Sequence, residues 1–285
     1  MGFRLSKNSQ SAYLSDIKKY TEFLQSKNTQ PAKATSAEIR EFILDRRTRS
    51  MESSTIAREV SSIRTFHKFL CIEGYSDENP GDNIYTPRLI QKIPQILATK
   101  QIDLLLAVIP KKRESDIRLR AMIELTYATG MRVSEVVSLE ISQIDFEHKY
   151  IQIFGKGRKE RTVMFGESAR TAILQYLNTR KNWESKFLFP TKLNKPMSRQ
   201  EFWRQLHTLA KGAGISETLS PHTLRHSFAT HMMNRGVNLN YIRELLGHSS
   251  LNTTQIYTKI IPQDLKNAHE KFHPRGKEIV SAGII

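Results

Sequence analysis

The sequence contains a single cysteine, Cys71, so the chain cannot form an intramolecular disulfide bond. Its 13 glycines and 10 prolines are too few for a collagen-like or linker-like repeat. The longest strongly apolar run, residues 104–109, is far shorter than the ~20 residues that a membrane-spanning helix needs. The first residues, MGFRLSKNSQ, lack the apolar segment of a secretory signal. We therefore expect a cytoplasmic or nucleoid protein that does not bind a membrane.

Several catalytic signatures are missing as well. No cluster of aspartate and glutamate at short spacing resembles the two-metal centre of a nuclease. The stretch GKGRKE is too short for a nucleotide-binding P-loop, and no Gly-x-Ser-x-Gly marks a serine hydrolase. His222, His226 and His231 have a spacing that can bind zinc, but no HExxH motif or nearby carboxylate completes such a site. We therefore expect no metal ion.

Positive charge is what the sequence has in excess. It contains 44 lysines and arginines against 28 aspartates and glutamates, which gives a formal net charge of +16 at pH 7. Such an excess is typical of proteins that bind nucleic acid, although charge alone leaves open a basic protein without this partner. The proportions of hydrophobic residues, 39%, and charged residues, 25%, indicate a globular chain with real cores.

The first third of the chain has the spacing of helices. Thr35 and Glu38 have the spacing of a capping box at the start of one of them. Apolar residues recur with helical spacing within 13–24, 39–43 and 56–70.

Three prolines then end the helical pattern. Pro80, Pro87 and Pro94 fall within fifteen residues, and each lacks the N–H that a helix needs and clashes with the preceding turn. An extended stretch of this kind is typical of an interdomain linker. The predicted parts are a helical N-terminal domain, a linker and a second domain, over residues 1–80, 81–96 and 97–285.

The second domain combines helices with one hairpin. Residues 150–154 and 161–165 have the composition of β-strands, and the basic segment GKGRKE joins them. The helix over 117–128 is expected to stop at Gly130. The whole chain is therefore predicted to be mostly α with a small β-hairpin. Further helical patterns cover residues 101–109, 169–176, 199–210, 222–234, 240–246 and 263–273.

The remaining polar signals are cationic side chains and histidines in the second domain. Arg132 and Glu135 are three residues apart, so on a helix they would share a face and the carboxylate could orient the guanidinium. His222 and Arg225 have the same spacing and follow a Ser-Pro pair that favours a helix start. A helix start with a histidine and an arginine suits an anionic phosphate. The other candidates are Lys156, Arg158, Lys159, Arg161, His248 and Tyr257.

Five blocks of sequence carry a resemblance to a known family. They are, in order, TYATGMRVSEVVSL (126–139), GKGRKER (155–161), SPHTLRHSFATHM (220–232), LLGHSSLNTTQIYT (245–258) and HPRG (273–276). In this order they are similar to the tyrosine recombinases, most closely to the Xer branch. The resemblance implies a helical core-binding domain followed by a catalytic domain, and a DNA strand transferase that needs no metal ion, cofactor or ATP.

The resemblance also implies roles for the matching residues. Tyr257 would be the nucleophile that forms a 3′-phosphotyrosyl bond, Lys156 the general acid, and Glu135 a supporting carboxylate. The phosphate-binding pocket would be formed by Arg132, Arg225, His222 and His248. Contacts to the DNA backbone near the hairpin would come from Arg158, Lys159 and Arg161. Alternatively, Arg158, Lys159 and Arg161 are solvated side chains of the hairpin without a DNA contact. Lys159 is also the alternative to Lys156 as the general acid.

These residue types suit phosphoryl transfer on physical grounds. A tyrosine has a pKa of about 10 and is a weak nucleophile at neutral pH, but nearby cations favour its phenolate. Two arginines offer paired donors to the oxygens on which negative charge develops. A lysine can deliver a proton to the leaving oxygen. The covalent intermediate retains the phosphodiester, so rejoining needs no ATP.

The resemblance further implies partners and a cellular task. The partner would be double-stranded DNA with a recombination site, on which four protomers assemble through the C-terminal helix near 263–273. A second Xer recombinase and a septal DNA translocase are further partners that this branch allows. The task would be the resolution of chromosome dimers at a dif-like site. A phage, transposon or plasmid integrase, a type IB topoisomerase and a catalytically inactive DNA-binding protein are the alternatives.

Overall fold

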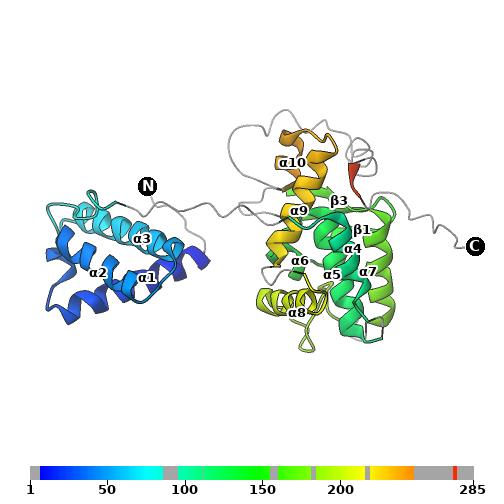
Figure 1. Ribbon diagram of the computed structural model, residues 1–285, viewed down its shortest axis with the longest axis horizontal. Coiled ribbons are helices and arrows are strands. Elements are labelled where there is room, and N and C mark those ends of the chain that lie inside the picture. The colour runs from blue at the N-terminus through cyan, green and yellow to red at the C-terminus, as the bar shows by residue number, and fades with distance from the viewer. Residues whose placement is uncertain are drawn as a thin grey trace, which may run out of the picture. The chain divides into compact units, whose positions relative to one another are not determined.

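The computed structural model describes residues 7–85, 96–110, 112–154, 160–180, 184–215, 219–246 and 272–274. The chain divides into two compact units, Met1–Lys92 and Ile93–Ile285, and Figure 1 shows that both are built mainly from helices. The expectation of a mostly helical fold with a small β-hairpin is confirmed. Within the described ranges, no helix combines the length and the apolar character needed to cross a bilayer.

Helices with one apolar face form the first unit. Tyr20 and Phe42 lie in its core, where their rings meet edge to face. The predicted capping box is confirmed, because the Thr35 N–H donates to Glu38 at 2.9 Å and the Thr35 hydroxyl accepts from the Ala37 N–H at 3.2 Å. The elements are α1 (Lys7–Ser26), η1 (Pro31–Lys33), α2 (Ser36–Thr48) and α3 (Ser53–Ile72).

The first unit extends past the predicted end of the N-terminal domain. Ile84 is buried in its core, and Arg64 Nε donates to the Gly81 carbonyl at 3.0 Å in the turn before it. The linker predicted over 81–96 therefore starts later than expected, because one isoleucine beyond the last helix gives no periodic signal. Residues 86–95 of this linker lie outside the described residues.

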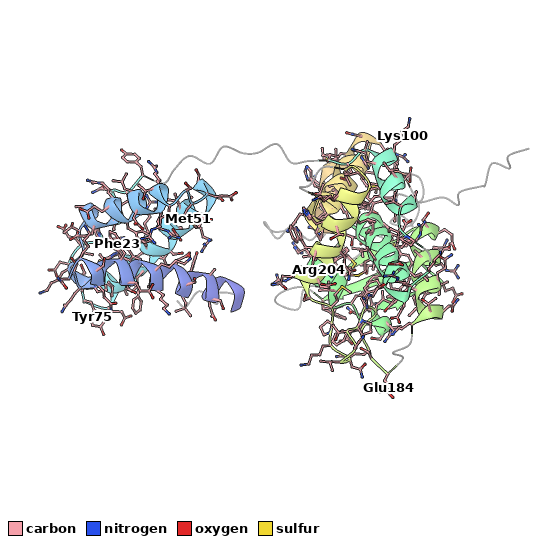
Figure 2. All side chains as sticks on the ribbon, turned by 60° about the horizontal axis from the view of Figure 1, so that its bottom comes forward. Phe23, Met51, Tyr75, Lys100, Glu184 and Arg204 are labelled. Atoms are coloured by element: carbon pink, nitrogen blue, oxygen red, sulfur yellow. The ribbon has the colours of Figure 1, made fainter. Side chains whose placement is uncertain are left out.

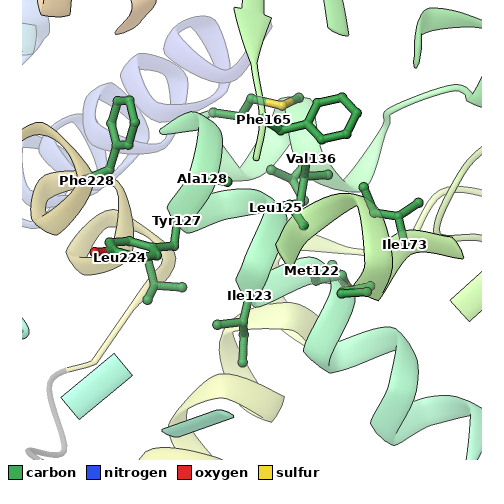
Figure 3. Packing of buried hydrophobic residues seen from close by; sticks show 14 of the residues in the cluster. Met122, Ile123, Leu125, Tyr127, Ala128, Val136, Phe165, Ile173, Leu224 and Phe228 are labelled. Carbon is green, nitrogen blue, oxygen red and sulfur yellow. The ribbon is translucent and has the colours of Figure 1, made fainter. Parts of the chain in front are cut away.

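The second unit packs its helices around α5. Every side chain from Ala121 to Thr129 is buried, so α5 is enclosed near its C-terminal end. Figure 3 shows Leu224 and Phe228 of α9 on one side of α5 and Ile173 of α7 on the other. The helices are α4 (Thr99–Ala107), α5 (Glu114–Thr129), α6 (Val133–Val137), η2 (Ile141–Gln143), α7 (Glu167–Thr179), α8 (Arg199–Gly212), α9 (Pro221–Asn234) and α10 (Leu239–Leu246).

A three-stranded antiparallel sheet with the order β1-β2-β3 lies in the same unit. The predicted hairpin is confirmed as β2 (Tyr150–Phe154) and β3 (Glu160–Met164). The sequence did not predict β1 (Ile144–Asp145), because two residues are too few to show an alternating pattern. The tip of the hairpin, residues 155–159, lies outside the described residues.

Apart from the one over 263–273, the helices predicted for the second domain are confirmed, with ends that shift by up to three residues. The helix predicted over 263–273 lies outside the described residues except for Phe272 and His273. Figure 2 shows charged side chains such as Lys100 and Arg204 projecting from the surface of this unit.

Candidate active site

A glycine turn between α5 and α6 sets the position of Arg132. Gly130 has a φ of +62°, which glycine adopts without strain, and its N–H donates to the Thr126 carbonyl at 3.0 Å. A Cβ at this position would lie 2.5 Å from the ring of Phe228 and 2.8 Å from the side chain of Leu246. Glycine therefore lets the chain pass close to α9 and α10. Two residues later, Arg132 is the N-cap of α6.

Arg132 and Glu135 form the contact that their spacing predicts. The Arg132 backbone N–H donates to Glu135 Oε2 at 2.7 Å, and Arg132 Nη1 donates to Glu135 Oε1 at 3.1 Å. Arg132 precedes the helix, so the carboxylate caps the helix start as well as binding the guanidinium. The Arg132 side chain is 41% exposed and that of Glu135 only 14%, so the arginine is the member of the pair that a ligand can reach.

Arg161 of β3 is the second arginine on the same carboxylate. Its Nη1 donates to Glu135 Oε1 at 2.9 Å and its Nη2 to Glu135 Oε2 at 2.6 Å, in a bidentate pair. Its Nε donates to the Leu245 carbonyl in α10 at 3.0 Å. The side chain is only 12% exposed.

Arg161, predicted to contact the DNA backbone, binds Glu135 and the end of α10 in this structure. Arg161 pairs across the hairpin with the buried Ile153 and lies two residues from the buried Val163. Residues opposite each other or two apart on strands share a face, so the Arg161 side chain points inward. The strand's own sequence, ERTVM, does not alternate in burial, so the direction of Arg161 follows from the register with β2.

Arg225 of α9 is the third arginine of the site, and it is buried. Its Nη1 donates to the Gly130 carbonyl, and its Nη2 donates to the Leu246 carbonyl at 2.7 Å. Burial, and next the positive charge of Arg132, lower the pKa of the Arg225 guanidinium to about 10, so it stays protonated at neutral pH. The bond to Gly130 brings Arg225 beside the turn that carries Arg132.

His222 lies in the first turn of α9, as predicted. The Ser220 hydroxyl caps this helix by accepting from the Thr223 N–H at 3.2 Å, and Pro221 is its first residue. His222 is exposed whereas Arg225, one turn later, is buried. The two side chains expected to point the same way therefore differ in their access to solvent.

Two of these arginines hold the C-terminal end of α10. The Leu245 carbonyl accepts from Arg161 and the Leu246 carbonyl from Arg225. The last carbonyls of a helix lack partners within the helix and carry partial negative charge, so cations stabilise them. The site thus joins β3, the start of α6, α9 and the end of α10.

We call Arg132, Arg161, Arg225 and Glu135 the arginine cluster. Burial raises the pKa of the Glu135 carboxyl. The hydrogen bonds from Arg161 and Arg132 and the positive charge of Arg161 together lower it by more than burial raises it, so the net pKa is below its usual value. Glu135 is therefore ionised at neutral pH, and three guanidinium groups against one carboxylate leave the cluster with net positive charge. Such a cluster can bind an anion and neutralise charge that develops on it.

The remaining predicted site residues lie outside the described residues. They are Lys156, Arg158, Lys159, His248 and Tyr257. Among the side chains that the structure does describe, no three histidines, cysteines, aspartates or glutamates are gathered as a metal ion would require.

One group near the site was not predicted from the sequence. The Tyr127 hydroxyl and His231 Nδ1 are 2.8 Å apart, and His273 Nε2 lies 3.2 Å from the Tyr127 carbonyl. His273 is buried, with its ring 5.0 Å from that of Tyr127 and 5.6 Å from that of Phe228. The end of the predicted C-terminal helix thus packs on the core of its own chain. The contacts of Tyr127 with His231 and His273 join residues more than 100 positions apart, which no local pattern indicates.

Comparisons with known proteins identify the family to which the chain belongs. The sequence pattern described as "Phage integrase family" matches residues 95–263, and that of its N-terminal SAM-like domain matches residues 3–74. A tyrosine recombinase XerD of Oceanobacillus iheyensis is 37% identical and covers 95% of this chain and 94% of the relative. A tyrosine recombinase XerD of Shewanella oneidensis is 39% identical and covers 95% and 92%.

A solved structure has the same fold. The XerH site-specific recombinase bound to a palindromic difH substrate, in a post-cleavage complex, matches with a TM-score of 0.71. It is 23% identical and covers 92% of this chain and 78% of that chain. At this identity the likeness concerns the fold alone.

Proposed function

The chain belongs to the phage integrase family, in the Xer branch of the tyrosine recombinases, and on this premise we propose that Tyr257 carries out a site-specific exchange of DNA strands. The observation that supports this assignment is the arginine cluster. It brings Arg132 and Arg225, 93 positions apart, to one turn through the bond from Arg225 to the Gly130 carbonyl. Two arginines held in this way provide donors for the two non-bridging oxygens of one phosphate.

In the cleavage step, the Tyr257 oxygen attacks the phosphorus and forms a 3′-phosphotyrosyl bond. The bond from phosphorus to the 5′ oxygen breaks, and Lys156 gives that oxygen a proton. His222 and His248 complete the pocket, where one of them accepts the phenolic proton. His248 follows the clamped end of α10 by two residues.

In the joining step, the 5′ hydroxyl of another strand attacks the phosphotyrosine and releases Tyr257. The number of phosphodiester bonds is unchanged, so the cycle needs neither ATP nor a redox partner. Arg132 and Arg225 stabilise the charged oxygens in both steps, because the two steps pass through equivalent transition states.

The substrate is double-stranded DNA, and we assign to this activity the resolution of chromosome dimers at a dif-like site in the cytoplasm. Four protomers would assemble on two such sites, with contacts that include the C-terminal helix, and a second recombinase and a septal translocase would act with them. An integrase of a phage, transposon or plasmid would use the same residues on other sites. The chemistry and the DNA sequence must therefore be tested together.

The test is a trap for covalent protein–DNA adducts. The wild type and Tyr257→Phe are incubated with a pool of nicked random duplexes in the presence of a metal chelator, denatured, and the attached DNA is sequenced. We expect an adduct only with the wild type, enriched in one motif. An adduct without an enriched motif would instead indicate a topoisomerase. DNA binding without any adduct, on duplexes that carry dif-like sites and with a second recombinase added, would indicate an inactive DNA-binding protein.

A further inference from the structure

We propose that Arg161 is a positioning residue for this reaction: it holds Glu135 against Arg132 and fixes the end of α10, and it does not contact DNA. This inference rests on the proposed function, because it concerns the phosphate-binding arginine and the segment that leads to His248. It replaces the expectation that Arg161 belongs to a DNA-contacting hairpin with Arg158 and Lys159.

All three guanidinium nitrogens of Arg161 donate hydrogen bonds to other residues of the chain. Nη1 and Nη2 bind the two oxygens of Glu135 at 2.9 and 2.6 Å, and Nε binds the Leu245 carbonyl at 3.0 Å. A guanidinium has donors in a fixed planar fork, so it can satisfy a carboxylate and a carbonyl at once. A lysine ammonium is a compact charge and cannot reproduce this geometry.

The pairing of Arg161 also argues against a phosphate contact. Its two Nη atoms bind both oxygens of Glu135, whereas Arg225, which is buried, binds two backbone carbonyls. Arg161 lies on the inner face of the hairpin, opposite Ile153 and beside Val163. To reach a DNA phosphate it would have to leave a half-buried carboxylate, which is strongly unfavourable for Glu135.

Glu135 passes the effect of Arg161 on to Arg132. Each carboxylate oxygen accepts one bond from Arg161 and one from Arg132, with Oε1 bound by both side chains and Oε2 by the Arg161 side chain and the Arg132 backbone. Without Arg161, Arg132 alone would neutralise the carboxylate. Its guanidinium would then be drawn toward Glu135, at the expense of an incoming phosphate.

The bond to Leu245 adds a second route to the same site. Arg161 and Arg225 bind successive carbonyls at the end of α10, and His248 follows two residues after Leu246. Without the bond to Leu245, only the bond from Arg225 to the Leu246 carbonyl would link an arginine of the cluster to this helix end. Arg161 therefore supports Arg132 and the end of α10 while touching neither DNA nor the reacting atoms.

The test separates DNA affinity from the rate of cleavage. The variants are Arg161→Ala, Arg161→Lys and the control Arg170→Ala, in which an arginine loses bonds of the same kinds, from Nε to the Phe146 carbonyl and from Nη1 to Glu167. The dissociation constant and the single-turnover rate of cleavage at saturating DNA are measured on a nicked substrate that the wild type cleaves. We expect both Arg161 variants to bind within about 2-fold of the wild type and to cleave roughly 10- to 100-fold more slowly, and Arg170→Ala to match the wild type.

A substrate with a methylphosphonate at the scissile position gives a readout that a general loss of structure would not move. The methyl group removes one charged oxygen, so less charge remains for Arg132 to neutralise. We expect the defect of Arg161→Ala to shrink several-fold on this substrate, whereas a general loss of structure would slow cleavage of both substrates equally. Should Arg161→Ala fail to fold, Arg161→Gln tests the same link and should show the same pattern, because its amide cannot bind both oxygens of Glu135 and the Leu245 carbonyl at once.

Other outcomes would overturn the inference. Weaker binding of Arg161→Ala, with a salt dependence lower by about one phosphate contact and a normal rate at saturation, would make Arg161 a DNA-contacting residue. A normal rate and normal affinity would show that it has no role. Cleavage by the wild type separates these results from a failure of the proposed function, since a wild type that never cleaves would overturn both.

Discussion

Arg161 of β3 and Glu135 of α6, 26 positions apart in the sequence, are joined by two hydrogen bonds of 2.9 and 2.6 Å. The same carboxylate binds Arg132, the exposed arginine of the site. In this arrangement an acidic residue supports the arginine to which we assign the phosphate. Glu135 is ionised and paired on both sides, so it orients Arg132 while the second arginine preserves the positive charge of the cluster.

Replacement of Lys156 tests the general acid. Lys156→Ala should bind DNA normally and cleave about 10²- to 10⁴-fold more slowly, because the 5′ oxygen then leaves without a proton. A substrate with sulfur in place of that oxygen should restore most of the rate, since a thiolate is a far better leaving group. Single-turnover cleavage of both substrates measures this. If sulfur gives no rescue in Lys156→Ala but does in Lys159→Ala, the acid is Lys159.

Replacement of Gly130 tests how far the stability of the second unit depends on the close approach of its turn to α9 and α10. Gly130→Ala combines a left-handed backbone, φ +62°, with a Cβ 2.5 Å from the Phe228 ring. Gly214→Ala is the control, because its φ is +65° and nothing lies within 4 Å of its added Cβ. We expect a loss of about 1–2 kcal/mol in the free energy of unfolding for the control and roughly 3 kcal/mol or more for Gly130→Ala. Equal losses in denaturant unfolding would mean that the neighbours yield without strain.

Loss of one partner of a buried ion pair should strongly destabilise the first unit. Arg46 donates to both oxygens of Glu59, at 2.9 and 2.8 Å, and the Glu59 side chain is 1% exposed. Glu59→Gln should lower the free energy of unfolding by about 3–5 kcal/mol, because it leaves a buried charge without its counter-charge. The control Glu41→Gln breaks an exposed pair with Lys27 and should lower it by less than about 1 kcal/mol. Hydrogen exchange of the α2 and α3 amides measures both losses, and similar protection in the two variants would contradict the prediction.

The buried His67 makes the first unit sensitive to acid. His67 Nε2 lies 3.0 Å from the Tyr20 hydroxyl, and burial lowers the pKa of His67 from 6.5 to about 4. The unfolded chain therefore takes up a proton at a pH where the folded chain does not. This contribution is absent above about pH 6.5 and destabilises the folded state progressively down to pH 4, by about 3 kcal/mol in total.

Hydrogen exchange of α3 amides at several pH values, corrected for intrinsic exchange rates, measures the effect of His67. A His67→Asn variant should be less stable than the wild type at pH 7 but should lose less stability between pH 6.5 and 4. Parallel losses in the two proteins would place the acid sensitivity elsewhere.

Local patterns predicted much of the fold from the sequence. The capping box of Thr35 and Glu38, the stop at Gly130 and the hairpin of β2 and β3 each depend on residues close together in the chain. Such signals arise from hydrogen bonds and periodicity within one element. The burial of Ile84 and the contact of Tyr127 with His231 depend on tertiary packing and left no local signal.

The candidate site was predicted only in part for the same reason. The pair Arg132 and Glu135 follows from their spacing, and it is present. The inward direction of Arg161 follows from its register opposite Ile153, which the strand's own sequence does not indicate, and the surrounding basic residues favoured a solvent-facing interpretation. Its partner Leu245 is 84 positions away, so the clamp on α10 could be found only in the structure.

The most direct test of the proposed chemistry is to identify the residue that carries the DNA. The covalent adduct is trapped on a nicked duplex, digested with nuclease and protease, and the modified peptide is sequenced by mass spectrometry. We predict a single nucleotide joined through a 3′ phosphate to Tyr257. A modification on any other residue, or an adduct that persists in Tyr257→Phe, would contradict the assignment of the nucleophile.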